Sequence, residues 1–166
     1  VGEEVYMDIL NRAKRYVHIM TPYLILDDDM KNALCFAAKR GVEVIIIMPH
    51  IPDKMYAYLL ARTYYPELIQ AGVQIYEYTP GFVHAKEFIC DDEKAVVGTI
   101  NLDFRSLYLH FECGVYLYRS SAVGQMEADF KETLLKCQRI ALKDCAAYPA
   151  LKRLAGRTLR LIAPLM

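Results

Sequence analysis

Hydrophobic residues along this chain of 166 residues recur with two spacings, which predict alternating helices and strands. Segments whose apolar residues lie three and four positions apart are expected to be amphipathic helices, and short runs rich in Val, Ile and Tyr are expected to be strands. The predicted helices cover residues 3–14, 27–39, 53–71 and 126–142. The predicted strands cover residues 16–20, 44–48, 73–78, 82–90, 94–98 and 107–118.

The ends of these elements and their order indicate one fold class. Residues 44–48 form a continuous apolar run that ends at Pro49, as expected for a central strand buried on both faces. The aspartates at 27–29 lie at the positive end of the second helix, and Gly41 follows that helix as its stop. Gly72 has the same position after the third helix. This alternation predicts an α/β protein, an α-β-α sandwich whose mixed β-sheet carries helices on both faces.

A β-hairpin is predicted in the middle of the chain. The runs 82–90 and 94–98 have the composition of strands, and the polar residues Asp91, Asp92 and Glu93 separate them as a turn. Side chains two residues apart on a strand point the same way, so Asp91 should point away from the side chains at 84 and 86. We therefore interpret Asp91 as a structural acceptor that braces the turn and not as a catalyst.

The hairpin carries a spaced set of polar residues of the form H-x-K-x(4)-D, followed after six residues by G-[S/T]-x-N, in which the glycine is Gly98. His84 and Lys86 are expected on one face of the first strand. Thr99 and Asn101 are expected to share a face at the end of the second strand, so folding the hairpin could bring all four side chains around one anion-sized space. His84 can act as a nucleophile, Lys86 supplies positive charge, and Thr99 and Asn101 offer uncharged donors. These are the groups needed to hold and attack a phosphodiester without a metal.

Histidine alone is a weak sign of catalysis, because a lone histidine is more often structural. His18, His50 and His110 are interpreted as structural, since none has a lysine two residues later. The spacing to Lys86 distinguishes His84 from them.

This stretch resembles the phospholipase D superfamily, which is known by its His-Lys-Asp motif. The extension at residues 101–106, together with Phe111 and Glu112, resembles bacterial cardiolipin synthases more narrowly. The likeness covers nearly the whole chain and matches the second, C-terminal half of such a synthase. Thr99 stands where many superfamily members have Ser, and either hydroxyl can serve. Further similar stretches lie at residues 21–23, 64–68 and 76–82.

The resemblance implies a mechanism and a missing partner. In it, neutral His84 attacks phosphorus and forms a covalent phosphohistidine, while Lys86, Thr99 and Asn101 hold the phosphoryl oxygens. The general acid is then the histidine of a second motif copy, but this chain has one copy. Either two such chains pair as a homodimer, or a missing N-terminal catalytic half supplies the second motif. No metal and no other cofactor is expected.

Glu112 and Arg105 are further candidates with two interpretations each. Glu112 lies between apolar neighbours, so it is expected to be shielded from water and to need a partner. A bond to His84 would fix the tautomer of the imidazole, as the resemblance implies, whereas the alternative is a strand-edge glutamate that faces solvent. Arg105 is expected either to pair with Asp103 or to reach the phosphate or headgroup.

Composition narrows the class of partner. Lys plus Arg and Asp plus Glu number 20 each, so the net charge is zero, which argues against a nucleic-acid partner. Five cysteines show no C-x-x-C spacing, which argues against disulfides and zinc. No apolar run approaches the length of a membrane span. The chain begins with Val1, so a trimmed fragment is expected. A full synthase should carry an N-terminal membrane anchor.

The last residues are predicted to form a separate segment. We expect a phospholipase D-like catalytic half-domain at 1–145 and a basic amphipathic C-terminal tail at 146–166. In the tail, arginines at 153, 157 and 160 share one helical face, and apolar residues at 154, 161, 162 and 165 share another. Such a segment can rest on an anionic bilayer, or it can pack against the domain or the missing half.

Three functions are compatible with these residues. The first is a phosphatidyl transferase that joins two phosphatidylglycerols into cardiolipin and releases glycerol. The second is a phosphodiesterase, either a phospholipase D or a nuclease, that uses water as the acceptor. The third is an inert domain that only binds anionic lipid. The first predicts that the full-length protein is at the bacterial cytoplasmic membrane, with this fragment soluble.

Overall fold

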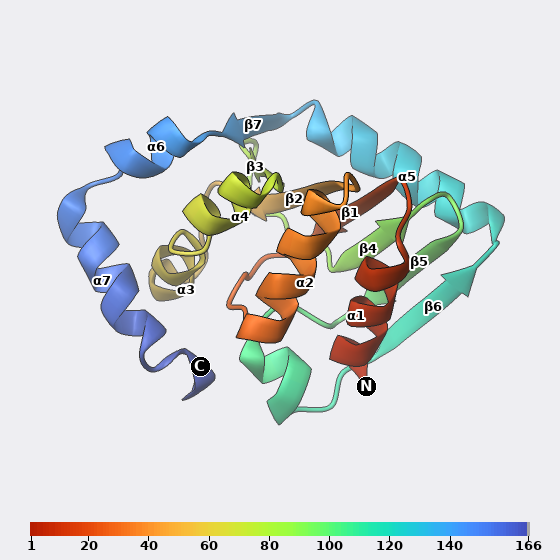
Figure 1. The fold of residues 1–166 in the computed structure, drawn as a ribbon, viewed down its shortest axis with the longest axis horizontal. Coiled ribbons are helices and arrows are strands. Elements are labelled where there is room, and N and C mark those ends of the chain that lie inside the picture. Colours follow the sequence, from red (N-terminus) through yellow and green to blue (C-terminus); the bar gives the residue numbers. More distant parts are fainter. Residues whose placement is uncertain (166) are drawn as a thin grey trace.

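The computed structural model describes residues 1–165, of which Leu165 is described by its backbone only, and it contains seven strands and seven α-helices (Figure 1). The strands are β1 (Tyr16–Met20), β2 (Glu43–Pro49), β3 (Gln74–Tyr78), β4 (Glu87–Cys90), β5 (Lys94–Gly98), β6 (Gly114–Tyr118) and β7 (Cys137–Ile140). The helices are α1 (Gly2–Arg12), α2 (Asp28–Lys39), α3 (Met55–Ala61), α4 (Tyr65–Ala71), α5 (Ser121–Leu134), α6 (Leu142–Ala147) and α7 (Ala150–Arg160). Short helical turns cover Arg105–Leu109 and Ala163–Leu165.

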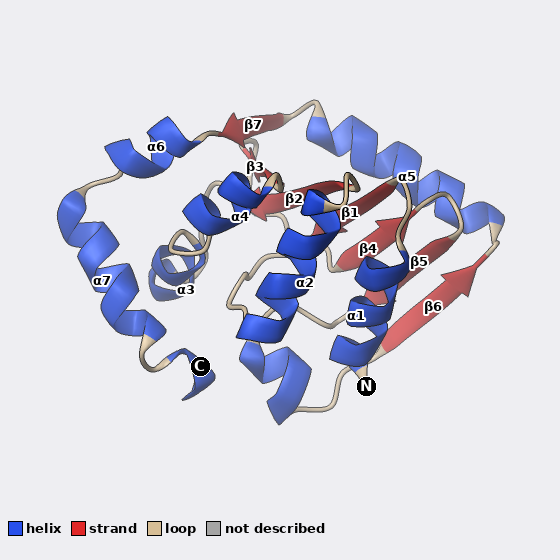
Figure 2. Cartoon of the chain, in the orientation of Figure 1, coloured by secondary structure: helices blue, strands red, loops and turns tan. Residues whose placement is uncertain are grey.

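All the strands belong to one mixed sheet with the order β6-β5-β4-β1-β2-β3-β7 (Figure 2). The three central strands β1, β2 and β3 are parallel, because helices connect them. On one side, β4 pairs antiparallel with β1, and β5 and β6 continue as antiparallel neighbours. On the other side, β7 pairs antiparallel with β3. The predicted mixed sheet is therefore confirmed.

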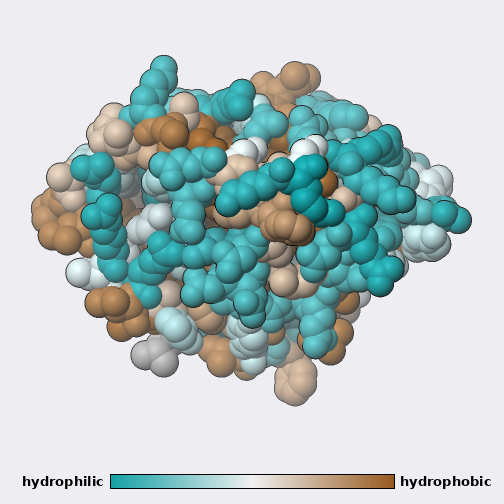
Figure 3. Space-filling view, in the orientation of Figure 1, coloured by the Kyte–Doolittle hydropathy of each residue, from teal (hydrophilic) through white to brown (hydrophobic). Residues whose placement is uncertain are grey.

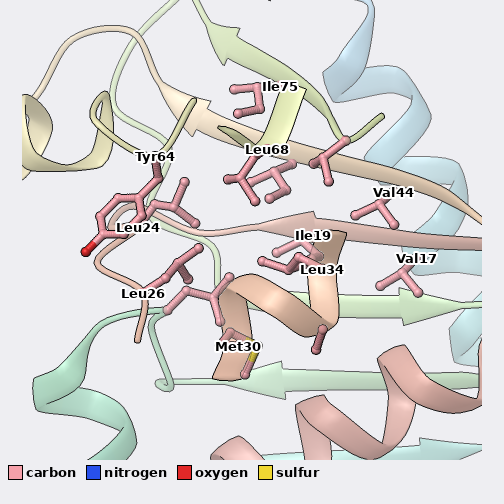
Figure 4. Packing of buried hydrophobic residues seen from close by; sticks show 14 of the residues in the cluster. Val17, Ile19, Leu24, Leu26, Met30, Leu34, Val44, Tyr64, Leu68 and Ile75 are labelled. Carbon is pink, nitrogen blue, oxygen red and sulfur yellow. The ribbon is translucent and has the colours of Figure 1, made fainter. Parts of the chain in front are cut away.

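Helices cover both faces of this sheet. One face packs against α1, α2, α3 and α4, and its buried residues form the larger apolar cluster (Figure 4). This cluster includes Val17, Ile19, Leu34, Val44, Ile46, Leu68 and Ile75. The opposite face packs against α5, and its cluster includes Tyr16, Ile45, Ile47, Ile89, Val123 and Phe130. Alternate residues of β1 and β2 thus point into different clusters, and the predicted α-β-α sandwich is confirmed.

The predicted helix over 53–71 is wrong in one respect, because it consists of two helices. Helix α3 ends at Ala61 and α4 begins at Tyr65. Pro66 lies in the first turn of α4, has no N–H, and its ring would clash with the carbonyl four residues earlier if α3 continued. Gly72, with φ of 105°, ends α4 as predicted.

Two predicted strands are too long. The strand predicted over 82–90 begins only at Glu87, because Glu87 pairs with Met20, the last residue of the neighbouring β1, so earlier residues have no strand beside them. The strand predicted over 107–118 begins only at Gly114. Before it, the Asp103 carboxylate accepts a hydrogen bond from the Ser106 backbone N–H (2.7 Å) and starts a helical turn.

The predicted helix over 126–142 is displaced toward the N-terminus. Helix α5 begins after Ser120, whose hydroxyl accepts from the backbone N–H of Ala122, and it ends at Leu134. Strand β7 follows, and the sequence pattern did not predict it. This strand has four residues, of which only Ile140 is buried, so it has almost no apolar signal.

The predicted tail contains the end of α6 and all of α7, and α7 packs against α3. The contact is close, because a Cβ atom at Gly156 would lie 2.6 Å from the carbonyl oxygen of Leu59. The arrangement corresponds to the alternative in which the tail packs against the domain. Met166 and the side chain of Leu165 lie outside the described residues. The division at residue 145 remains a prediction.

Candidate active site

Strand topology brings the predicted site residues to one edge of the sheet. The end of β1 lies beside the start of β4, since Met20 pairs with Glu87. The end of β5 lies beside the same point, because Val97 also pairs with Glu87, and β6 starts there through the Gly98–Gly114 pair. Ligand sites in open α/β sheets commonly form at such an edge. The segments that meet here are 21–25, 50–54, 82–86, 99–103 and 110–113.

His84 is exposed at this edge, in the extended loop before β4 and not on the strand itself. Its ring is tilted against the Phe82 ring, with 5.4 Å between the ring centroids. Within residues 1–165, the imidazole nitrogens make no hydrogen bond. An exposed ring without internal partners is accessible to a substrate in solution or at a surface.

Lys86 is buried, and its Nζ donates a hydrogen bond to the His84 carbonyl oxygen (2.6 Å). Burial lowers the pKa of this lysine below its ordinary value, while the charges of Glu112, Asp103 and Asp53 oppose that shift. The ammonium group makes no ion pair within 4.0 Å among the described residues, so its one bond is the one to the His84 backbone. This bond ties the buried lysine to the loop that carries the exposed imidazole.

Thr99 and Glu112 form a contact across the ends of β5 and β6. The Thr99 hydroxyl donates to Glu112 Oε2 and accepts from the backbone N–H of Cys113 (3.0 Å). Burial raises the pKa of the Glu112 carboxyl, but hydrogen bonds from Thr99, Ser106 and His110 outweigh it and lower the pKa below the ordinary value. Glu112 is thus held as a carboxylate.

The predicted bond between Glu112 and His84 is not formed within residues 1–165. Glu112 precedes β6, and its carboxylate is turned toward Thr99 and His110, whose Nδ1 lies 3.3 Å from Oε1. In this arrangement the Thr99 hydroxyl is committed to Glu112, so it can donate to a phosphate only after that bond is exchanged. The sequence missed His110, because its contact depends on the helical turn that replaced the predicted strand.

Arg105 is not paired with Asp103 among the described residues, and its reach to a phosphate or headgroup stays a prediction. Its Nε donates to Nε2 of His110 (2.7 Å). Because Nε2 accepts this bond, Nδ1 of His110 carries the ring proton and donates toward Glu112. Arg105, His110, Glu112 and Thr99 therefore form one chain of polar contacts along the rim of the site.

Asn101 lies in the same edge region with one polar atom unsatisfied. Its Nδ2 donates to Ser106 Oγ (3.0 Å), while its Oδ1 is buried and has no partner within residues 1–165. Buried polar atoms without a partner are uncommon in folded proteins, so such an atom at a site indicates room for a further interaction. Ser106, the last residue of the 101–106 stretch, was not predicted individually as a site residue.

Asp91 occupies the opposite end of the hairpin from His84. Its carboxylate accepts from the backbone N–H groups of Lys14 (2.8 Å), Arg15 (2.8 Å) and Tyr16 (2.9 Å). Burial raises the pKa of Asp91, and these three bonds outweigh it and lower the pKa. With φ of 55° at Asp91 and 58° at Asp92, the turn has the left-handed conformation of a type I′ hairpin.

Gly98 allows the close approach of the two strands that carry Thr99 and Glu112. A Cβ atom at this position would lie 2.1 Å from the carbonyl oxygen of Cys113 and 2.6 Å from Cα of Gly114. Real Cβ atoms do not approach so closely, so a side chain here would separate β5 from β6.

Other polar groups near this edge of the sheet are not among the predicted site residues. Tyr23 donates to Asp53 Oδ2 (2.6 Å), and both follow the ends of parallel strands. The buried Glu77 carboxylate accepts from Arg62 (2.7 Å) and lies 2.9 Å from Nδ1 of His50. Their positions after strands are the sequence signal that could have found Tyr23 and Asp53. The described residues 1–165 contain no group of three His, Cys, Asp or Glu side chains placed to hold a metal ion.

Several solved structures share this fold, and one of them is described as a phospholipase D family member. Nuc from Salmonella typhimurium, a phospholipase D family member, matches with a TM-score of 0.72 at 18% identity, over 83% of this chain and 90% of that chain. The phosphatidylserine synthase of Haemophilus influenzae matches with a TM-score of 0.73 at 18% identity, over 99% of this chain and 42% of that chain. The sheet and its edge site define a protein of the phospholipase D fold class.

Sequence comparison narrows this class to a family. The family model described as cardiolipin synthase, PLD-like domain, matches residues 6–134, and this chain belongs to that family. It is 40% identical over 166 residues to a cardiolipin synthase of Alkalihalophilus pseudofirmus and spans 33% of that protein. It is 58% identical over 166 residues to an uncharacterized protein of Streptococcus mutans and spans 36% of it. These alignments thus include the whole of this chain, but the chain spans only about a third of the length of each relative.

Proposed function

We propose that this chain is the one-motif catalytic part of a phosphatidyl transferase that makes cardiolipin from two phosphatidylglycerols and releases glycerol. The observation that carries the proposal is that His84 exposes its imidazole while its backbone carbonyl accepts a hydrogen bond from the buried Lys86 ammonium. Membership in a cardiolipin synthase family supports phosphatidyl transfer as the reaction. The full-length protein would act at the bacterial cytoplasmic membrane, where its lipid substrate lies.

The reaction would be two successive displacements at phosphorus. A neutral ring nitrogen of His84 attacks the phosphorus of one phosphatidylglycerol, a P–N bond forms, and the bond to the glycerol oxygen breaks. The leaving oxygen takes a proton and departs as glycerol. A hydroxyl of the second phosphatidylglycerol then attacks phosphorus and gives up its proton, the P–N bond breaks, and the imidazole is restored.

The residues at the sheet edge would stabilise the charge of this reaction. Lys86 would hold a phosphoryl oxygen, as a fixed cation that needs no reorganisation when charge develops. Asn101, whose Nδ2 now donates to Ser106, and Thr99, whose hydroxyl now donates to Glu112, would turn these donors to the phosphate after the substrate displaces the present contacts. Glu112 and His110 would position Thr99 rather than His84.

The proton donor and acceptor would come from another chain or from another part of a longer protein. The group that donates and accepts the proton must lie on the side of phosphorus opposite His84. This chain has one H-x-K motif, so it has no second motif histidine for that position. A second motif copy would supply its histidine there. The chain spans about a third of its curated relatives, which is compatible with a second catalytic half elsewhere in a longer protein.

The exposure of His84 to solvent also favours a second candidate, a phosphodiesterase in which water replaces the second alcohol. Incubation of the chain with labelled phosphatidylglycerol separates the candidates. Cardiolipin as product supports the transferase, and phosphatidic acid supports the phosphodiesterase. No product from either the chain alone or the chain joined to a second motif half supports a domain that only binds lipid.

The His84→Ala variant tests the assigned nucleophile in the same incubation. The His84 ring makes no internal hydrogen bond within residues 1–165, so we expect the variant to keep the melting temperature of the wild type while product formation stops. Full activity in this variant would refute the assigned nucleophile.

A further inference from the structure

A basic cavity lies between the helix pair α3 and α4 and the helix pair α6 and α7, apart from the residues of the candidate active site. Its volume is about 530 Å³, within the range of ligand pockets. One carboxylate lines it, that of Glu67. The basic side chains that line it are Arg62, Lys152, Arg153, Arg157 and Arg160.

Three of these cations are not neutralised. Arg62 is paired with Glu77 (2.7 Å), and Glu67 lies 3.3 Å from Lys31 and 3.8 Å from Arg160. The remaining three are Lys152, Arg153 and Arg157, and within residues 1–165 they have no carboxylate within 4.0 Å. Positive charge therefore concentrates in a hollow of a chain whose net charge is zero. Such a hollow attracts an anion.

The packing of the cavity walls orients Arg62 and Arg160, the two arginines that also have a carboxylate nearby. Helix α7 contacts α3 through Gly156, whose position leaves no room for a side chain. The Arg62 guanidinium lies 4.3 Å from the centre of the Tyr148 ring, and that of Arg160 lies 4.3 Å from the centre of the Tyr64 ring. Arginines that are already oriented lose less freedom when they bind a phosphate.

The outer side of α7 is apolar and exposed. At 100° per residue, Leu151, Leu154 and Leu161 project away from Gly156, and their exposed fractions are 80%, 59% and 83%. Figure 3 shows hydrophobic side chains along the left edge of the molecule, where α7 lies in Figure 1. Arg153 and Arg157 lie on the flank of the helix between this leucine ridge and the cavity.

We propose that the cavity binds the phosphate headgroup of an anionic phospholipid while the leucine ridge of α7 enters the surface of the bilayer. The two features complement a lipid at an interface, because arginines pair with phosphate and leucines lie at the level of the acyl chains. A soluble phosphate ester has no acyl chains that could contact the leucine ridge. This headgroup site does not depend on the chemistry at His84, and it would keep the chain at the membrane between reactions.

The test is flotation of the chain with phosphatidylcholine vesicles that contain or lack phosphatidylglycerol. The pocket variant is Arg153→Gln with Arg157→Gln, and the control variant is Lys14→Gln with Arg139→Gln, which removes the same charge from exposed positions outside the cavity. We expect the pocket variant to bind phosphatidylglycerol vesicles about thirtyfold more weakly, since two basic residues at an anionic surface are lost. The control should bind like the wild type.

Two further measurements complete the test. A third variant, Leu151→Ser with Leu154→Ser, should also weaken vesicle binding, and soluble glycerol phosphate at the same phosphate concentration should not compete. Equal losses in the pocket and control variants would show diffuse charge and overturn the proposal. Competition by glycerol phosphate with no effect of the leucine variant would show a small-anion site and would also overturn it. Unchanged melting curves establish that the variants are folded.

Discussion

Lys86 shows how much of the site depends on a single buried charge. The ammonium group is buried and donates to the backbone of His84, while the charges of Glu112, Asp103 and Asp53 favour its charged form. A cation in this position can both hold the loop that carries the imidazole and meet the anionic substrate. Its removal should therefore affect catalysis more than an exposed lysine would.

The Lys86→Met variant is predicted to reduce kcat about 100-fold, the usual cost of losing one preorganised charge donor to the transition state. Lys94→Met, on the same hairpin, is the control and should keep normal turnover. The turnover of both variants is measured with labelled phosphatidylglycerol. Each variant is tested in the form in which the wild type is active, either as the chain alone or as the chain joined to a second motif half. Normal turnover by Lys86→Met would contradict the phosphate-binding assignment.

A pH dependence follows from the lowered pKa of Lys86. Burial favours its neutral form, so the group loses its proton at a lower pH than the ordinary value of 10.5. As pH rises through this lowered pKa, the cation disappears and turnover should fall. The alkaline limb of the kcat/KM profile should therefore lie below pH 10.5 and be absent from Lys86→Met.

Asp91 illustrates a residue whose effect is on stability. Asp91→Asn should lower the free energy of unfolding at pH 7 by about 2 kcal/mol, because it weakens three charge-assisted hydrogen bonds to the backbone. The folded-state pKa is lowered, so the stabilisation is present above the unfolded pKa and is lost as pH falls through the folded pKa. Urea unfolding of both proteins at pH 7 and in acid measures this. A constant difference at every pH would be inconsistent with a carboxylate effect.

At the scale of elements, the close approach of β5 and β6 sets the geometry of the site rim. Gly98→Ala should lower the free energy of unfolding by about 3 kcal/mol, since the added methyl group meets backbone atoms that cannot move independently. Gly124→Ala in α5 is the matched control, because no atom lies within 4 Å of the added Cβ. It should be neutral or stabilise by up to about 1 kcal/mol. Equal effects in chemical denaturation would show that strand approach is not the constraint.

The elements also show which features local sequence patterns specify. Continuous apolar runs predicted β1 and β2, and a glycine correctly marked the end of α4, because these signals are local. Strand β7 and the helical turn at Arg105–Leu109 were missed, because pairing with β3 and a side-chain bond from Asp103 determine them. An edge strand of four residues with one buried side chain has too short an apolar pattern to be predicted from the sequence.

The site was predictable only in part for the same reason. The spacing of His84 and Lys86 indicated the chemistry without a structure. The actual partner of Glu112 was not predictable, because the contact with Thr99 and His110 requires the register of β5 against β6. The catalytic roles of His84, Lys86, Asn101 and Glu112 remain predictions.

At the scale of the whole molecule, the decisive feature is that one chain carries one motif. The chain spans 33% of the cardiolipin synthases with which it aligns over its full length. If the isolated chain turns over substrate, a second copy must supply the opposing histidine. The rate per chain should then rise with chain concentration.

Mixing experiments test this dependence. Adding inactive His84→Ala chain to a fixed amount of wild type should lower the rate per wild-type chain, because mixed pairs lack one of the two histidines. A rate per wild-type chain that depends on neither total concentration nor added variant would show that one copy suffices.

The covalent intermediate is the most direct test of the central claim that His84 is the nucleophile. The wild-type protein, in its active form, is mixed with phosphatidylglycerol labelled at phosphorus, quenched in alkali, digested and analysed by mass spectrometry. We predict a phosphatidyl adduct, or its glycerophosphoryl form after alkali has removed the acyl chains, on the peptide that contains His84, with a P–N bond that is lost in acid, and absent from His84→Ala. Turnover with the label on another residue, or undiminished turnover by His84→Ala, would contradict the account.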